Sequence, residues 1–240
     1  MAGLLLIHAF PVDASMWEPQ IDAMGDDVMA PNLPGFGGTA AADGVMTMDA
    51  AADFVAGELD RAGIDRAVVC GLSIGGYVAF SLWRRHRDRI AGLALADTRA
   101  EPDDEAGRDR RRGVAEKARS GGSEAIAEEP PPLLSEGADL ALWNRVKDMI
   151  RRQPGEAIAA ASLGMAGRPD SRPILGDIDV PTTVIVGSAD TLTPPPMSES
   201  MAKAIPRAEL AVLDGVGHLS NLEAPDAFTA ALRSLLRRTE

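Results

Sequence analysis

The sequence is poor in cysteine. Its 240 residues include one, Cys70, so no disulfide can form within the chain. A lone thiol fits the reducing cytoplasm, where disulfides are rare. The start of the chain also lacks a basic segment followed by a small-residue cleavage site, so we expect no signal peptide. Together these absences predict a cytoplasmic protein.

Long apolar runs and excess positive charge are absent as well. No apolar run approaches the roughly 20 residues of a membrane-spanning helix, so we expect no membrane partner. The formal net charge of −12 at pH 7 argues against nucleic-acid binding, because phosphate contacts need a basic surface. One basic cluster, RDRRRG at 108–113, follows acidic residues and is interpreted as a solvated helix face.

Histidine is equally scarce, with only His8, His86 and His218 in the chain. These three and the one cysteine have no metal-ligand spacing, so we predict no metal site. No glycine-rich phosphate fingerprint precedes a helix, apart from the turn at Ser73. We therefore expect no cofactor.

Short apolar runs that alternate with helical patterns make up most of the chain. Runs of this kind, bounded by turn residues, are typical of strands buried on both faces of a parallel sheet. The strand candidates are GLLLIHAF, DDVMAPNLPGFG, RAVVCG, IAGLALAD, TTVIVGSAD and AELAVLDG. The helix candidates are 14–24, 48–62, 74–86, 196–204 and 225–238. The pattern predicts a single large α/β domain with a mostly parallel sheet flanked by helices.

One stretch interrupts this alternation. After the strand that ends at Asp97, residues 101–172 contain charged helical segments and no convincing strand. We interpret 101–172 as a helical cap inserted between two parts of the core, 1–100 and 173–240. The alternative is a peripheral helical subdomain that does not contact substrate.

The clearest chemical motif lies between a predicted strand and a predicted helix. Residues 71–75, Gly-Leu-Ser-Ile-Gly, fit the pattern G-x-S-x-G. A nucleophilic serine needs a sharp strand-to-helix turn with small neighbours, and the helix N-terminus favours developing negative charge. Ser73 is therefore the predicted nucleophile. The alternative is an ordinary glycine-rich turn.

An activated serine needs a general base and a carboxylate that orients the base. His218 follows the last apolar run, at the sheet edge where α/β proteins place catalysts, and is the predicted base. His86 lies at the charged end of a helix and His8 in an early loop. Asp190 follows the penultimate strand and is the predicted acid, with Asp97 as the alternative.

The sequence resembles the α/β-hydrolase superfamily in motifs that span almost the whole chain. The matching segments are HAFP, PNLPGFGGT, GLSIGG, GSADTLTPP and GVGHLSNLEAP. The resemblance implies an oxyanion hole made by the backbone N–H groups of Phe10 and Ile74. Two features differ: Ala9 replaces a usual glycine, and the N-terminal β-hairpin of the family is missing. The sheet should then have about six strands. The edge left by the missing hairpin could form a homodimer contact, and without that contact the protein is a monomer.

Within the superfamily the chain is similar to 3-oxoadipate enol-lactonase-like hydrolases and to cofactor-free esterases and perhydrolases. We therefore expect a serine hydrolase that cleaves a small carboxylic ester or lactone through an acyl-enzyme. The alternatives are an enol-lactonase for a carboxylate-bearing lactone, a perhydrolase, a carbon–carbon bond hydrolase, and a non-catalytic binding protein on the same fold. The resemblance gives His8 a role in holding the oxyanion loop by hydrogen bonds.

Substrate specificity should come from the cap and the loops around the serine. Arg99 could bind a substrate carboxylate through two parallel guanidinium N–H donors, or it could be a surface arginine. The other candidates could form an apolar acyl pocket or could simply be core and cap packing; they are Trp17, Phe36, Leu72, Trp143 and Met165.

Overall fold

The computed structural model describes residues 3–25 and 27–240. In this part of the chain six strands form one sheet in the order β2-β1-β3-β4-β5-β6, and every pairing is parallel. The strands are β1 (Gly3–Ile7), β2 (Val28–Met29), β3 (Ala67–Leu72), β4 (Ile90–Ala96), β5 (Thr182–Gly187) and β6 (Ala208–Leu213). The predicted parallel sheet of about six strands is confirmed.

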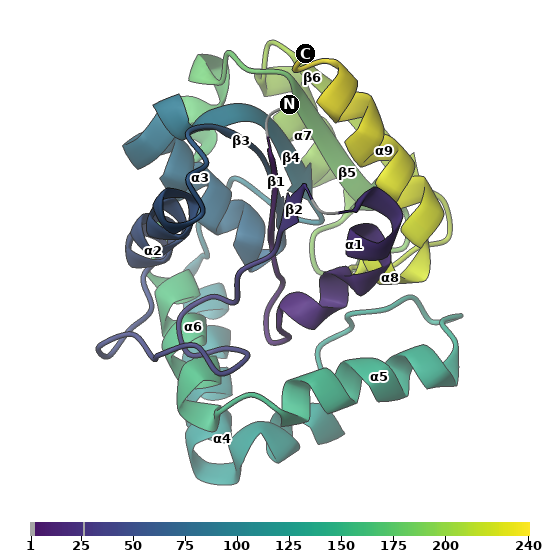
Figure 1. Ribbon diagram of the computed structural model, residues 1–240. Helices are drawn as coiled ribbons and strands as arrows, with labels where there is room; N and C mark the ends of the chain where they lie inside the picture. Colours follow the sequence, from purple (N-terminus) through teal and green to yellow (C-terminus); the bar gives the residue numbers. More distant parts are fainter. Residues whose placement is uncertain (1–2, 26) are drawn as a thin grey trace.

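Helices cover both faces of the sheet. α2 (Met48–Arg61) and α3 (Ile74–His86) pack on one face, and α1 (Glu18–Met24) and α9 (Pro225–Arg237) pack on the other (Figure 1). α7 (Pro195–Ala204) packs on β5 and β6, and short α8 (Ser220–Glu223) precedes α9. Three 3-10 helices complete the core: Ala14–Trp17, Arg87–Arg89 and Arg172–Asp177. No helix among the described residues is both long and apolar enough to cross a membrane.

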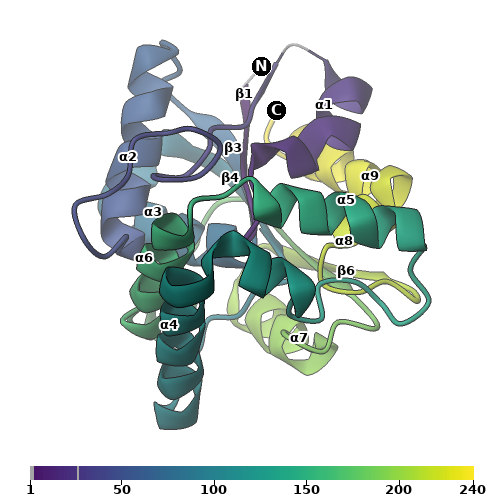
Figure 2. The same ribbon diagram turned by 90° about the horizontal axis from the view of Figure 1, so that it is seen from below.

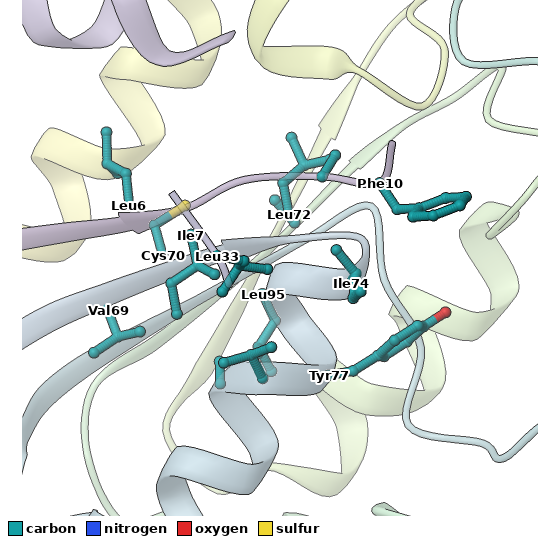
Figure 3. Close-up of a cluster of buried hydrophobic side chains, with 14 of the residues drawn as sticks. Leu6, Ile7, Phe10, Leu33, Val69, Cys70, Leu72, Ile74, Tyr77 and Leu95 are labelled. Atoms are coloured by element: carbon teal, nitrogen blue, oxygen red, sulfur yellow. The ribbon is translucent and has the colours of Figure 1, made fainter. Parts of the chain in front are cut away.

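Strands β3 and β5 are buried along their whole length. This burial explains why β3 is a continuous apolar run in the sequence and why β5 is apolar after its two threonines, Thr182 and Thr183. Figure 3 shows part of this core, where Leu6, Cys70 and Leu72 lie among other aliphatic side chains. Burial raises the pKa of the Cys70 thiol, so it stays protonated. Cys70 is thus a small core side chain.

Three helices lie together beyond the carboxyl end of the sheet, and we call them the cap (Figures 1 and 2). They are α4 (Glu105–Glu128), α5 (Leu140–Arg151) and α6 (Gly155–Ala166). α4 is kinked at Gly122, whose φ of 68° is accessible to glycine at little cost. The structure describes all of 101–172 and has no strand there, in agreement with the helical character expected of this stretch.

Candidate active site

Ser73 lies on the sharp turn between β3 and α3. Its φ is 57°, in the left-handed region that side chains rarely adopt. A Cβ on Gly71 would lie 2.1 Å from the carbonyl oxygen of Gly75, and a Cβ on Gly75 would lie 2.2 Å from that of Ile7. Only glycine fits these two positions. The structure therefore has the strand, turn and helix that the motif predicts, and Ser73 stands at the N-terminus of α3.

His218 and Asp190 come together from two loops at the same edge of the sheet. Asp190 follows β5 and His218 follows β6, and His218 Nδ1 lies 2.8 Å from Asp190 Oδ2. Both side chains are buried. Burial acts to raise the pKa of Asp190, but the hydrogen bonds and charge of its partners, His218 first, hold this pKa below its ordinary value. The carboxylate stays ionised and can orient the imidazole.

Thr193, in the same loop as Asp190, holds the Asp190 carboxylate in place, and this role was not predicted from the sequence. The Thr193 hydroxyl donates to Asp190 Oδ2 at 2.6 Å. The N–H groups of Leu192 and Thr193 donate to Asp190 Oδ1 at 2.8 and 3.0 Å. An aspartate that binds backbone N–H groups two and three residues ahead is a common turn motif, so the segment ADTLT carried a readable signal.

Ser73 and His218 line one cavity of about 300 Å³ between the core and the cap. Among the described residues no hydrogen bond joins the Ser73 hydroxyl to His218, and in free enzymes such bonds are often long. The charged residues in the wall are Arg99, Arg111, Lys117 and Glu129. The apolar wall comes from core and cap alike and includes Phe10, Tyr77, Ile126, Leu133, Met165 and Leu192.

The loop after β1 brings Phe10 to this cavity. Phe10 lines the cavity, and the N–H groups of Phe10 and Ile74 have no backbone acceptor in the part of the chain that the structure describes. His8 holds the loop by two hydrogen bonds. Its Nε2 accepts from the Leu33 N–H at 3.0 Å, and its Nδ1 lies 2.8 Å from the Ala9 carbonyl oxygen. Burial lowers the pKa of His8 to about 4, so the ring is neutral and donates from Nδ1.

Two of the six predicted pocket residues line the cavity, and the other four lie elsewhere. Arg99 and Met165 line the cavity. Trp17, Phe36 and Leu72 do not: they are fully buried in the core, with the Trp17 ring against Phe228 and the Phe36 ring against His8. Leu72 ends β3 and points into the apolar cluster of Figure 3. Trp143 is half-buried on α5, where it packs against the core.

His86, expected to have no catalytic role, and Asp97, the alternative acid, have other partners. His86 Nε2 lies 2.7 Å from Asp53 Oδ1 at the end of α3, close to the surface. Asp97 is fully buried, and its carboxylate accepts hydrogen bonds from the Gly187 N–H and the Ser220 hydroxyl. Asp190 is thus the carboxylate bonded to His218.

Comparisons with known proteins show the family of the chain. The model of the Alpha/beta hydrolase family matches residues 4–231. A pimeloyl-acyl-carrier-protein methyl ester esterase of Aromatoleum aromaticum is 31% identical over 252 aligned residues, which cover 98% of each chain.

Two solved structures are similar over nearly the whole chain. A thermophilic esterase from Thermogutta terrifontis, solved with malate bound, is 42% identical with a TM-score of 0.96; the match covers 100% of this chain and 90% of that one. The enol-lactonase from Burkholderia xenovorans LB400 is 30% identical with a TM-score of 0.89, covering 99% of this chain and 92% of that one.

Proposed function

Because the chain belongs to the α/β hydrolase family and is a hydrolase, we propose that it cleaves a small carboxylic ester or lactone with Ser73, His218 and Asp190. The observation that carries this proposal is the cavity wall: Ser73 and His218 line it together, and Asp190 is bonded to the far side of the imidazole at 2.8 Å. The esterase and enol-lactonase relatives support the reaction class.

The reaction proceeds in two halves through an acyl-enzyme. Ser73 Oγ attacks the carbonyl carbon while His218 takes the hydroxyl proton, and Asp190 stabilises the imidazolium. The N–H groups of Phe10 and Ile74 bind the developing oxyanion, a contribution of about 3 kcal/mol for each donor. His218 then gives its proton to the departing alcohol oxygen. Water attacks the acyl-enzyme by the same steps and releases the acid.

Ser73→Ala tests the proposed nucleophile. The variant should fold, lose turnover of p-nitrophenyl acetate and escape labelling by a fluorophosphonate probe that labels the wild type. Undiminished turnover would contradict the proposal. A wild-type protein that neither turns over esters nor takes the label would instead be a binding protein on this fold. Peracid formation and carbon–carbon bond cleavage, run in the same panel, distinguish the perhydrolase and carbon–carbon hydrolase readings.

A second candidate, hydrolysis of a lactone or ester that carries a carboxylate, is favoured by the charges around the cavity. Arg99, Arg111 and Lys117 line it, and Glu129 is the one acidic side chain in its described wall. Asp103, just behind the wall, pairs with both Arg99 and Arg111. Arg99 Nε is buried and has no partner among the described residues. A guanidinium with an unused donor beside an acyl pocket is suited to bind a carboxylate.

Arg99→Gln distinguishes the second candidate from hydrolysis of a neutral ester. It should raise KM for a lactone bearing a carboxylate and leave KM for a neutral ester of equal size unchanged. Arg112→Gln is the matched control, because Arg112 pairs with Asp109 on the exposed face of α4 and does not line the cavity. If Arg99→Gln leaves KM for the anionic lactone unchanged, the arginine does not bind the carboxylate.

A further inference from the structure

Asp97, the buried carboxylate that does not bond to His218, sits where the three loops of the site converge. It follows β4 directly, is fully buried, and has a φ of 43°, which non-glycine residues rarely adopt. Backbone strain of this kind persists only where the surroundings enforce it. The side chain is polar and lies in an apolar interior, so its hydrogen bonds decide what it does.

The Asp97 carboxylate joins the loop of the acid to the loop of the base. Oδ1 accepts from the N–H of Gly187, the last residue of β5, at 2.9 Å. Oδ2 accepts from the hydroxyl of Ser220, two residues after His218. One carboxylate therefore connects two loops. Its first partner, Gly187, lies three residues before Asp190, and its second partner, Ser220, lies two residues after His218.

The neighbours of Asp97 bind the turn of the nucleophile. The Ser73 N–H donates to the Ala96 carbonyl at 2.9 Å, and the Thr98 hydroxyl donates to the Ser73 carbonyl at 2.8 Å. Ala96 and Thr98 thus contact the turn of Ser73, and Asp97 between them contacts the loops that carry the acid and the base.

The loops that carry the acid and the base are closely packed against each other. A Cβ on Gly187 would lie 2.2 Å from the Val216 carbonyl oxygen, and the Ala189 N–H donates to the same oxygen at 2.8 Å. The bond between Asp190 and His218 fixes these two residues to each other, but it does not set their position relative to Ser73. Catalysis depends on that position, because a misplacement of about 1 Å can reduce the rate about a hundredfold.

We propose that Asp97, through its hydrogen bonds to Gly187 and Ser220, is a positioning residue that holds the acid and base loops in register with the nucleophile turn. The inference rests on the proposed roles of Ser73, Asp190 and His218. Asp97 itself does not line the cavity, so we infer that it acts through the loops and not on the substrate.

Hydrogen bonding, rather than charge, performs this task. Burial and the charge of Asp190 raise the pKa of Asp97 well above its ordinary value, which favours a neutral side chain. An asparagine has nearly the same shape, can accept from the Gly187 N–H with its oxygen, and can donate to the Ser220 oxygen with its amide. Asp97→Asn should therefore preserve the bridge, whereas Asp97→Ala removes it.

The test compares Ser220→Ala, Asp97→Ala and Asp97→Asn with a matched control. Ser81→Ala is that control: Ser81 is also fully buried, and its hydroxyl also donates to an aspartate, Asp49, at 2.7 Å, but away from the cavity. We expect Ser220→Ala and Asp97→Ala to lower kcat about tenfold to a hundredfold with KM unchanged. Asp97→Asn should recover most of the loss, and Ser81→Ala should lower Tm alone.

Wild-type kcat in Ser220→Ala and Asp97→Ala would overturn the inference, as would an Asp97→Asn variant as slow as Asp97→Ala. If Asp97→Ala does not fold, Ser220→Ala decides, since it removes one bond and leaves the carboxylate in place. Failure of the proposed function looks different. In that case Ser73→Ala keeps its turnover, whatever the Asp97 and Ser220 variants do.

Discussion

Mild acid should weaken this protein through one buried side chain, that of His8. Burial lowers the pKa of His8 from 6.5 to about 4, so the folded protein keeps the ring neutral down to about pH 4. In the unfolded chain His8 takes up a proton near pH 6.5, so acidification favours unfolding. The stability that the neutral, buried ring contributes is therefore lost as the pH falls. Between the unfolded-state pKa of 6.5 and pH 5.5 lies one pH unit, which corresponds to about 1.4 kcal/mol. The contribution of His8 to the free energy of unfolding should therefore fall by about 1.4 kcal/mol between about pH 7.5 and 5.5.

Urea unfolding followed by circular dichroism at the two pH values measures this contribution. The wild type is compared with His8→Gln, whose amide offers one donor and one acceptor but does not titrate. The difference in unfolding free energy between the two proteins should shrink by about 1.4 kcal/mol from pH 7.5 to 5.5, because groups common to both cancel. Ser81→Ala, destabilised without losing a titratable group, should keep the wild-type pH dependence.

A difference that stays constant with pH would refute the reasoning, because His8 would then titrate alike in the folded and unfolded chains. Nuclear magnetic resonance gives an independent check on the folded protein. The chain has only three histidines, so the ring of His8 can be assigned by substitution. Its resonance should show no protonation down to about pH 5, a full unit above its pKa of about 4.

Three further substitutions probe the turn, the acid loop and the cavity. Gly75→Ala should unfold the protein or sharply lower its Tm, because the new Cβ would lie 2.2 Å from a backbone oxygen; Gly113→Ala, with nothing within 4 Å, should raise Tm slightly. Thr193→Val should lower kcat and leave KM unchanged, since Asp190 loses its hydroxyl donor at 2.6 Å. Met165→Ala should shift an ester panel toward longer acyl chains, whereas Phe36→Leu should lower Tm without changing acyl preference.

The sheet was predictable because burial on both faces favours apolar side chains along a strand. β3 and β5 are buried at every residue; β3 is a plain apolar run, and β5 has only Thr182 and Thr183 before its apolar residues. The nucleophile turn was predictable for a steric reason, since only glycine fits at Gly71 and Gly75. The pairing of Asp190 with His218 followed from topology, because the carboxyl ends of parallel strands meet at one edge.

The lining of the cavity could not be predicted in the same way. Whether an aromatic residue lies in the core or in a pocket depends on how the cap docks on the core, and that docking joins segments far apart in the chain. Trp17 and Phe36 look like pocket residues in the sequence but fill the core, whereas Tyr77 lines the cavity. Tyr77 had a signal: it lies four residues after Ser73, one helical turn along α3, and so faces the same side.

Asp103 connects the docking of the cap with the charge of the cavity. Its buried carboxylate pairs with Arg99 before the cap, with Arg111 on α4, and with Arg168, which follows α6 and stacks on the Tyr77 ring. Burial acts to raise the pKa of Asp103, but its arginine partners, Arg168 first, lower it, and the carboxylate stays ionised. One negative charge faces three positive ones. The cluster that anchors both ends of the cap therefore leaves excess positive charge beside the cavity, and this excess is the electrostatic basis of the proposal that the substrate carries a carboxylate.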